Sequence, residues 1–166
     1  TKTPVTDIYI RQAINYAINR DELVRYLRYG IGIPAVNGFV PPFLPGNKDE
    51  KMKGYTYDPD KASALLNKAG FPNGKGLPVI NMYITSDFTP IALAIQSQLQ
   101  RVGIKTNIQR EQPAMLAECV VSGQCYFFKK SWVGDYPDAE NFLSLFYSKN
   151  FSPEGVNYFH YSNVEF

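Results

Sequence analysis

The sequence predicts an α/β fold built as one domain, and three observations support this prediction. The chain has 166 residues, enough to bury a core in a single domain without depending on disulfides. From residue 58 onward, segments with apolar residues at helical spacing alternate with strand-like runs. Short joins that contain glycine or proline separate most of these segments. Such alternation is typical of βαβ units, in which a helix joins two parallel strands.

Composition and charge narrow the classes of function. Charged residues make up 19% of the chain and leave a net charge of only +2, so we expect no nucleic-acid partner. No run approaches the roughly 18 to 20 apolar residues that span a bilayer. Aromatic residues reach 14%, more than a minimal core requires. This excess predicts an aromatic-lined surface or a missing partner layer.

The N-terminal region predicts two successive helices. Asp7 is a favourable N-cap for the first, whose apolar residues fall on one face. The second begins at Asn19, which has capping-box spacing to Glu22, and ends at Gly30. The apolar residues of the two faces are Ile10, Ile14, Ala17 and Ile18 in the first helix and Leu23, Tyr26 and Leu27 in the second.

A long segment, residues 30–57, separates these helices from the rest of the chain. It is rich in glycine and proline and shows neither helical nor strand periodicity. Loops of this length are uncommon unless they are functional. We therefore expect a long loop, either ordered or mobile, that packs against something outside this chain.

A helix and a βαβ unit follow the loop. Asp58 and Pro59 are an N-cap and a first-turn proline, and Gly70 ends the helix. The strand, helix and strand of the βαβ unit are predicted at residues 77–85, 89–102 and 104–110. With these short joins, the two strands should be parallel.

The same alternation repeats once more before the C-terminal tail. A short helix, a strand and a last helix are predicted at residues 114–121, 126–133 and 139–147. The strand leads into a turn marked by Gly134 and Pro137. Residues 148–166 are polar and aromatic, and we expect them to wrap over the surface.

The two cysteines, Cys119 and Cys125, lie six residues apart at a predicted helix-to-strand turn. They lack the additional cysteine or histidine ligands that a structural zinc site needs, so we expect no metal. A disulfide formed in an oxidising compartment and a pair of buried free thiols are both compatible with this spacing.

Trp132 and Asp135 form the candidate ligand site. Asp135 should lie on the turn beyond a strand, where α/β sheets tend to bind ligands. An indole offers apolar area and a face that attracts cations, and a carboxylate accepts charge-assisted hydrogen bonds. The pair would therefore suit a ligand that carries an amine. The alternative is a core tryptophan beside an aspartate that only stabilises its turn.

Enzymatic interpretations have less support. His160 is the only histidine and lies in the tail, with no serine elbow or cysteine nucleophile motif nearby. Asp135, Asp138 and Glu140 could supply the acid pair of a glycoside hydrolase, but Asp138 is more simply the cap of the next helix. We therefore expect no catalytic residues.

Several motifs identify a family when they are taken together. They are Ile10-Arg11-Gln12-Ala13-Ile14-Asn15-Tyr16-Ala17-Ile18-Asn19-Arg20, Pro41-Pro42 with Pro45-Gly46, Tyr57-Asp58-Pro59-Asp60-Lys61-Ala62, Leu65-Leu66, Ala69-Gly70 and Trp132-Val133-Gly134-Asp135-Tyr136-Pro137-Asp138. In content, order and spacing they resemble the dipeptide and oligopeptide-binding proteins of ABC importers. The resemblance implies a lobe of the class II periplasmic-binding-protein fold, a mixed sheet with βαβ units flanked by helices.

The resemblance also implies a role. Residues 1–166 correspond to the second large lobe of a two-lobed receptor, so the first lobe is expected outside this chain. Such a receptor captures peptides outside the cytoplasm, free or lipid-anchored at the membrane surface. It hands them to an ABC permease, performs no chemistry and needs no cofactor. The expected partners are therefore a peptide ligand, the permease and the N-terminal lobe of the same receptor.

The resemblance assigns candidate ligand-binding residues. In such receptors the acid of the Trp-x-x-Asp turn pairs with the α-amino group of the ligand, a role that falls on Asp135, and the tryptophan lines a side-chain pocket, which falls on Trp132. Lys129 occupies the position of a cation that meets a peptide carboxylate, and Tyr136 lies in the same turn. If the strand alternates, Lys129 and Trp132 point to opposite faces, and the alternative for Lys129 is a solvated side chain.

Other functions remain as alternatives. Members of this family also bind nickel chelates, sugars and other solutes. A carboxylate-dependent hydrolase and a pure protein-interaction module are the competing classes outside the family. The carboxylate at Asp135 favours peptides, because a free peptide carries an ammonium group at its N-terminus.

Overall fold

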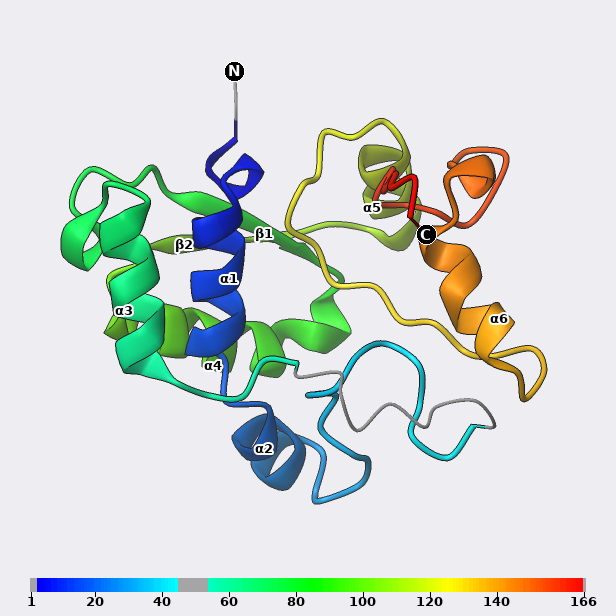
Figure 1. Ribbon diagram of the computed structural model, residues 1–166, viewed down its shortest axis with the longest axis horizontal. Helices are drawn as coiled ribbons and strands as arrows, with labels where there is room; N and C mark the ends of the chain where they lie inside the picture. Colours follow the sequence, from blue (N-terminus) through cyan, green and yellow to red (C-terminus); the bar gives the residue numbers. More distant parts are fainter. Residues whose placement is uncertain (1–2, 45–53, 166) are drawn as a thin grey trace.

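Two parallel strands and the crossover helix between them form the centre of the fold. The computed structural model describes residues 3–44 and 54–165. Strands β1 (Ile80–Ile84) and β2 (Thr106–Arg110) pair in parallel, with Ile80 opposite Thr106. Helix α4 (Thr89–Arg101) joins them and lies along the sheet (Figure 1). The predicted βαβ unit is therefore confirmed.

Helices α1 (Ile8–Ala17) and α3 (Pro59–Lys68) pack against each other and close the main core. Each begins where its cap predicts. The Asp7 carboxylate accepts hydrogen bonds from the first turn of α1, and the Asp58 carboxylate accepts one from the Lys61 amide. The buried residues of this core are Ile10, Ala13, Ile14, Ala17, Ala62, Leu65, Leu66, Leu77, Ile80, Leu99, Val102 and Ile104.

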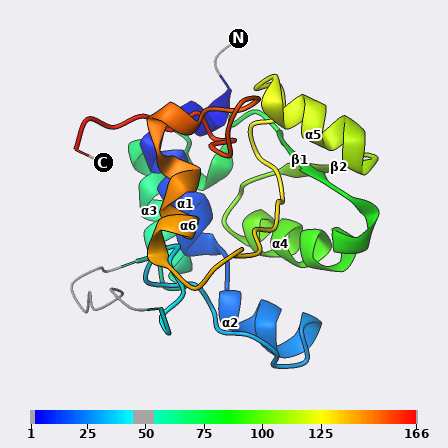
Figure 2. The ribbon, with the colours of Figure 1, turned by 90° about the vertical axis from the view of Figure 1, so that its right-hand side faces the viewer.

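The second predicted helix is present in a modified form. Helix α2 (Arg20–Glu22) continues as a π-helix over Leu23–Leu27. The buried Gln98 of α4 holds the start of α2 in place. Its side-chain oxygen accepts a hydrogen bond from the backbone N–H of Asn19, and its side-chain nitrogen donates one to the Glu22 carboxylate. Figure 2 shows this segment set apart below α4.

The predicted long loop is confirmed where the structure describes it. Residues 31–44 and 54–58 contain no helix or strand, and residues 45–53 lie outside the described part of the chain. Tyr29, Ile31, Ile33 and Phe43 are each at least 67% exposed. Phe39, by contrast, packs its ring on Phe146, with the two ring centroids 5.2 Å apart. The loop is thus attached to the C-terminal part of the chain through an aromatic contact.

The predicted strand at 126–133 is wrong in extent. Within the described part of the chain, one bridge joins this segment to the sheet, between Tyr83 and Phe128. The Tyr83 amide donates to the Phe127 carbonyl, and the Lys129 amide donates to the Tyr83 carbonyl. Beyond this bridge the segment leaves the sheet and runs towards helix α6 (Ala139–Leu143), as Figure 1 shows. All the strand pairing among residues 3–44 and 54–165 is parallel, so the described residues show only the parallel part of the expected mixed sheet.

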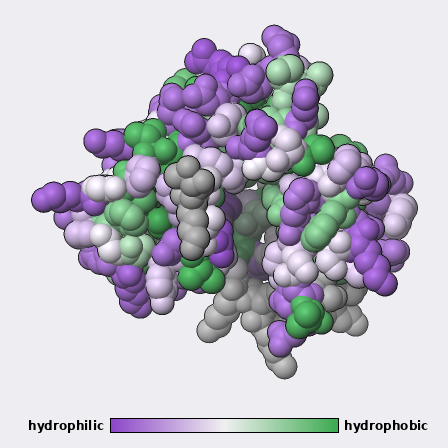
Figure 3. Space-filling model, turned by 90° about the horizontal axis from the view of Figure 1, so that it is seen from above, coloured by the Kyte–Doolittle hydropathy of each residue, from purple (hydrophilic) through white to green (hydrophobic). Residues whose placement is uncertain are grey.

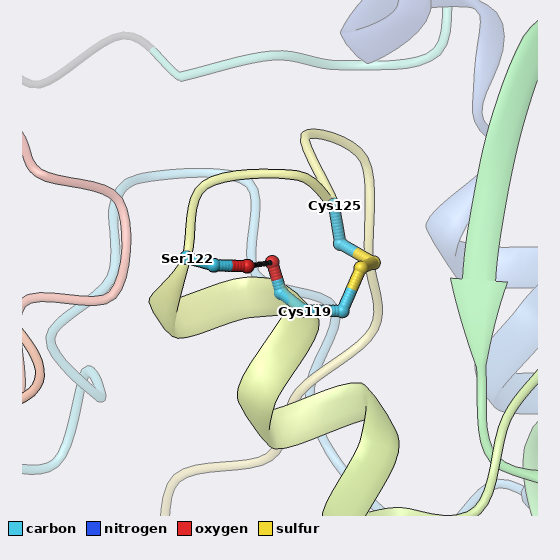
Figure 4. The surroundings of a disulfide bond; sticks show 3 residues. All are labelled: Cys119, Ser122 and Cys125. Carbon is cyan, nitrogen blue, oxygen red and sulfur yellow. Dashed lines mark hydrogen bonds between the residues drawn. A yellow bond between two sulfur atoms is a disulfide. The ribbon is translucent and has the colours of Figure 1, made fainter.

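Helix α5 (Pro113–Val121) ends in a disulfide. Cys119 and Cys125 are bonded, with their Cα atoms 5.3 Å apart, and Figure 4 shows the bond between the helix end and the following loop. The Ser122 hydroxyl donates to the Cys119 carbonyl across the same turn. Of the two possibilities that the sequence left open, the structure thus contains the disulfide.

The last helix is shorter than predicted, because α6 gives way to a 3₁₀ turn at Ser144–Phe146. The tail then folds around the fully buried Asn157, whose side-chain amide donates to the carbonyls of Tyr147 and Tyr161.

Figure 3 shows a hollow near the middle of the upper face, between the α1 and α3 side and the α6 side. Within the described residues, no helix is long and apolar enough to cross a membrane.

Candidate functional site

Trp132, Asn141 and Asp135 form a hydrogen-bonded chain at the start of α6. The indole N–H of Trp132 donates to Asn141 Oδ1 at 2.8 Å. Asn141 Nδ2 in turn lies 3.5 Å from Asp135 Oδ2, the length of a weak hydrogen bond. Asn141 is only 4% exposed, so the side chain that holds the other two is fixed by its surroundings. The two residues predicted for the site are therefore brought together by a third that the sequence did not indicate.

The Asp135 carboxylate is open to solvent. The residue is exposed, and no lysine or arginine of the described ranges 3–44 and 54–165 forms an ion pair with it. Its one hydrogen bond comes from a neutral amide at long distance. A carboxylate in this state keeps nearly all of its capacity to accept hydrogen bonds from an incoming cation.

The turn that carries Asp135 fits closely against α6. A Cβ atom at Gly134 would lie 3.2 Å from the Phe142 ring, so this glycine permits a close approach. Asp138 accepts a hydrogen bond from the Glu140 amide at 2.8 Å and caps α6, as predicted. That carboxylate is therefore engaged by the start of the helix, which is the simpler of the two roles considered for Asp138.

Lys129 and Trp132 line different cavities. Lys129 Nζ lies 3.1 Å from the centre of the Phe88 ring and is hydrogen-bonded to the Ser131 hydroxyl. Burial lowers the pKa of Lys129, the nearby Asp87 opposes this shift, and Arg28 adds to it. Lys129 is therefore half-buried, which differs from the solvated side chain considered as its alternative.

Lys130, two residues before Trp132, also contacts an aromatic ring. Its Nζ atom is 3.2 Å from the centre of the Tyr158 ring, a cation–π contact. The sequence assigned Lys130 no role. Both lysines of the segment therefore lie against aromatic rings.

Two cavities lie beside this segment: Lys129 lines one of them, and Lys130 lines both. The cavity beside Trp132 has a volume of about 90 Å³ and the one beside Lys129 about 240 Å³. The first is lined by Phe39, Phe128, Lys130, Ser131, Trp132, Leu145, Tyr158 and Phe159. Neither Asp135 nor Tyr136 lines these two cavities. Tyr136 is 48% exposed, so its ring lies at the surface of the turn.

Backbone groups are available along the same segment. From Lys130 to Asp135, no backbone N–H or C=O makes a hydrogen bond to another residue of the described ranges. An extended ligand that pairs with a backbone needs such groups, because main-chain bonds supply affinity without selecting side chains. Trp132 lies in the middle of this stretch.

A metal-binding cluster is not assembled in the described residues. No set of three or more histidine, cysteine, aspartate or glutamate side chains is placed to hold a metal. His160 Nε2 lies 3.0 Å from the Ser152 hydroxyl and 3.1 Å from the Ser152 carbonyl. The same ring nitrogen thus lies within hydrogen-bond distance of both the hydroxyl and the carbonyl of Ser152.

The sequence matches a model of a known protein family over most of its length. Residues 1–154 match the model described as bacterial extracellular solute-binding proteins, family 5 Middle. A dipeptide-binding protein of Escherichia coli (strain K12) is 32% identical over 161 residues, which are 95% of this chain and 30% of that protein. The glutathione-binding protein GsiB of Shigella flexneri serotype 5b (strain 8401) is 34% identical over 171 residues, 99% of this chain and 33% of that protein.

Solved structures of peptide-binding proteins are also similar to this chain. A periplasmic oligopeptide-binding protein of Borrelia burgdorferi superposes with a TM-score of 0.81 at 28% identity, over 99% of this chain and 32% of that one. The periplasmic binding protein DppA of Helicobacter pylori, in complex with the peptide STSA, has a TM-score of 0.82 at 29% identity, over 98% of this chain and 32% of that one. The chain thus spans about a third of the length of the relatives that it matches.

Proposed function

The chain belongs to the bacterial extracellular solute-binding proteins of family 5, and on this premise we propose that it is the ligand-binding lobe of a peptide receptor of an ABC importer. The receptor captures di- and oligopeptides outside the cytoplasm, free or lipid-anchored, and delivers them to a membrane permease. The lobe would close on its ligand together with an N-terminal lobe of the same receptor. Binding and release are its whole activity, and it catalyses no reaction.

The observation that carries this proposal is the open carboxylate of Asp135 beside the fixed ring of Trp132. The α-ammonium group of a peptide would pair with Asp135, which has no cationic partner in the described ranges. Charge-assisted hydrogen bonds of this kind contribute about 1.5 to 3 kcal/mol each. Trp132 would cover the adjoining part of the ligand, and Tyr136 would border it at the surface of the turn.

The remaining contacts follow the segment that precedes Asp135. The unpaired backbone groups from Lys130 to Asp135 would hydrogen-bond the peptide backbone, which all peptides share. Lys129 lies on the far side of this segment, beside the cavity of about 240 Å³. Lys129 would pair with the carboxylate of a peptide long enough to reach that side of the segment. It would therefore bind the far end of a longer ligand.

A ligand screen with the full-length receptor tests the proposal. Thermal shift and calorimetry would compare di- to hexapeptides and glutathione with nickel–histidine and simple sugars. We expect saturable binding of peptides that have a free amino terminus. Binding of a nickel chelate or a sugar in preference to all the peptides would overturn the assignment, as would turnover of an ester, glycoside or peptide.

A further inference from the structure

The cavity beside Trp132 is small and has aromatic walls contributed by distant parts of the chain. Its volume is about 90 Å³. For comparison, an apolar cavity of about 150 Å³ accommodates benzene. The space therefore fits a medium-sized aliphatic side chain better than a large ring. Its apolar lining residues are Phe39, Phe128, Trp132, Leu145, Tyr158 and Phe159.

The walls of this cavity are held in place by contacts within the chain. The rings of Phe128 and Phe159 stack with centroids 5.6 Å apart and planes at 14°. Phe159 also stacks on Phe146 at 5.7 Å, and Phe146 meets Phe39 edge-on. The hydrogen bond to Asn141 fixes the plane of Trp132. A pocket formed in advance discriminates by size, because its walls do not need to be ordered on binding.

The positive charge of Lys130 also affects which ligand side chains this cavity can bind. Lys130 is the one charged residue in its lining, with Nζ over the Tyr158 ring. No carboxylate of the described ranges pairs with this ammonium. A lysine or arginine side chain of a ligand would therefore meet apolar walls and a like charge together. Both effects disfavour cationic side chains here.

We propose that this cavity is a specificity pocket that selects a medium-sized aliphatic side chain, of leucine or valine size, in the first or second residue of the bound peptide. The inference rests on the proposed function, because it assumes that the ligand is a peptide anchored at Asp135. It goes beyond that function by assigning the pocket a preference for one class of side chain.

A panel of dipeptides tests the preference in the full-length receptor. Calorimetry would compare Leu-Ala, Ala-Leu, Ala-Ala, Lys-Ala and Ala-Lys. At one of the two positions we expect leucine to bind at least tenfold more tightly than alanine, and lysine more weakly than alanine. If leucine and alanine bind within threefold of each other at both positions, the pocket has no such role. Peptides would still bind in that case, whereas the absence of any binding would overturn the proposed function instead.

Two variants locate the preference in this cavity. Phe159→Ala should reduce the preference for leucine to below threefold and admit phenylalanine, while Phe151→Ala, which alters a ring that does not line the cavity, should retain it. Lys130→Gln should remove the discrimination against lysine, with Lys149→Gln as the control. Circular dichroism would verify that each variant is folded. An unchanged preference in both Phe159→Ala and Lys130→Gln would contradict the proposal, even if peptides bind well.

Discussion

The indole N–H of Trp132 donates a 2.8 Å hydrogen bond to the side-chain oxygen of the buried Asn141. The same amide reaches Asp135 through its nitrogen. One buried side chain on α6 thus sets the positions of an aromatic wall and an acid that both precede the helix.

Replacing Asn141 should therefore disturb both neighbours at once. Asn141→Ala removes the acceptor of the part-buried indole N–H, and the loss of such a hydrogen bond costs about 1 kcal/mol of stability. We also expect peptide affinity to fall by about tenfold, because Trp132 and Asp135 lose their common support. Urea unfolding and calorimetry would measure the two effects. Asn163→Ala is the matched control, since Asn163 is exposed. A variant that keeps full affinity despite lower stability would show that Asn141 does not position the site.

Asp135→Asn should weaken binding in a way that depends on the amino terminus of the ligand. Peptides with a free α-amino group should lose about 2 to 5 kcal/mol of binding free energy, as for the loss of one partner in an enclosed charge pair. N-acetylated peptides should lose much less, because they carry no ammonium group. Calorimetry with each peptide pair would measure the difference, and Glu140→Gln is a control at a nearby exposed acid. Equal losses for both ligand types would remove Asp135 from the amine-binding role.

The core elements were predictable because their signals are local. Asp58 followed by Pro59 starts α3 with a cap and a residue preset for the first turn, and both act within one helical turn. The βαβ unit is equally clear, since the apolar period changes from helix to strand across short joins. Burial in β1 alternates as that period predicts, with Ile80, Met82 and Ile84 buried.

The segment after Cys125 was less predictable because its conformation depends on distant contacts. Its sequence has the composition of a strand, yet it keeps only the bridge at Phe128. The partners that draw it from the sheet are Asn141 and Phe142 of α6, and the sequence pattern does not show that they are near. Asn141 was missed for the same reason, since an asparagine in a helix carries no signal of burial. The cavity beside Trp132 likewise depends on Phe39 and Phe159, which are distant in sequence.

The disulfide between Cys119 and Cys125 should stabilise the chain. It closes a loop of about seven residues, for which the chain-entropy relation gives about 2 kcal/mol. We expect the double variant Cys119→Ala/Cys125→Ala to lose about this much unfolding free energy in urea. Reductant should lower the melting temperature of the native chain and leave that of the variant unchanged. Equal sensitivity of both proteins to reductant would show that the effect arises elsewhere.

The half-buried Lys129 should make stability depend on pH in the alkaline range. Its pKa is lowered by burial, so the folded chain releases this proton before the unfolded chain does. Between the lowered pKa and the ordinary value of 10.5, the unfolded state binds more protons, and stability rises with pH. Below that window both states are charged, and the folded state bears the full cost of burying the ammonium. Lys129→Met should therefore be at least as stable as the native chain at pH 7 and should lack this rise. Denaturant unfolding from pH 7 to 10.5, with exposed Lys130→Met as the control, would measure the difference; parallel pH profiles for the native chain and Lys129→Met would contradict the assignment.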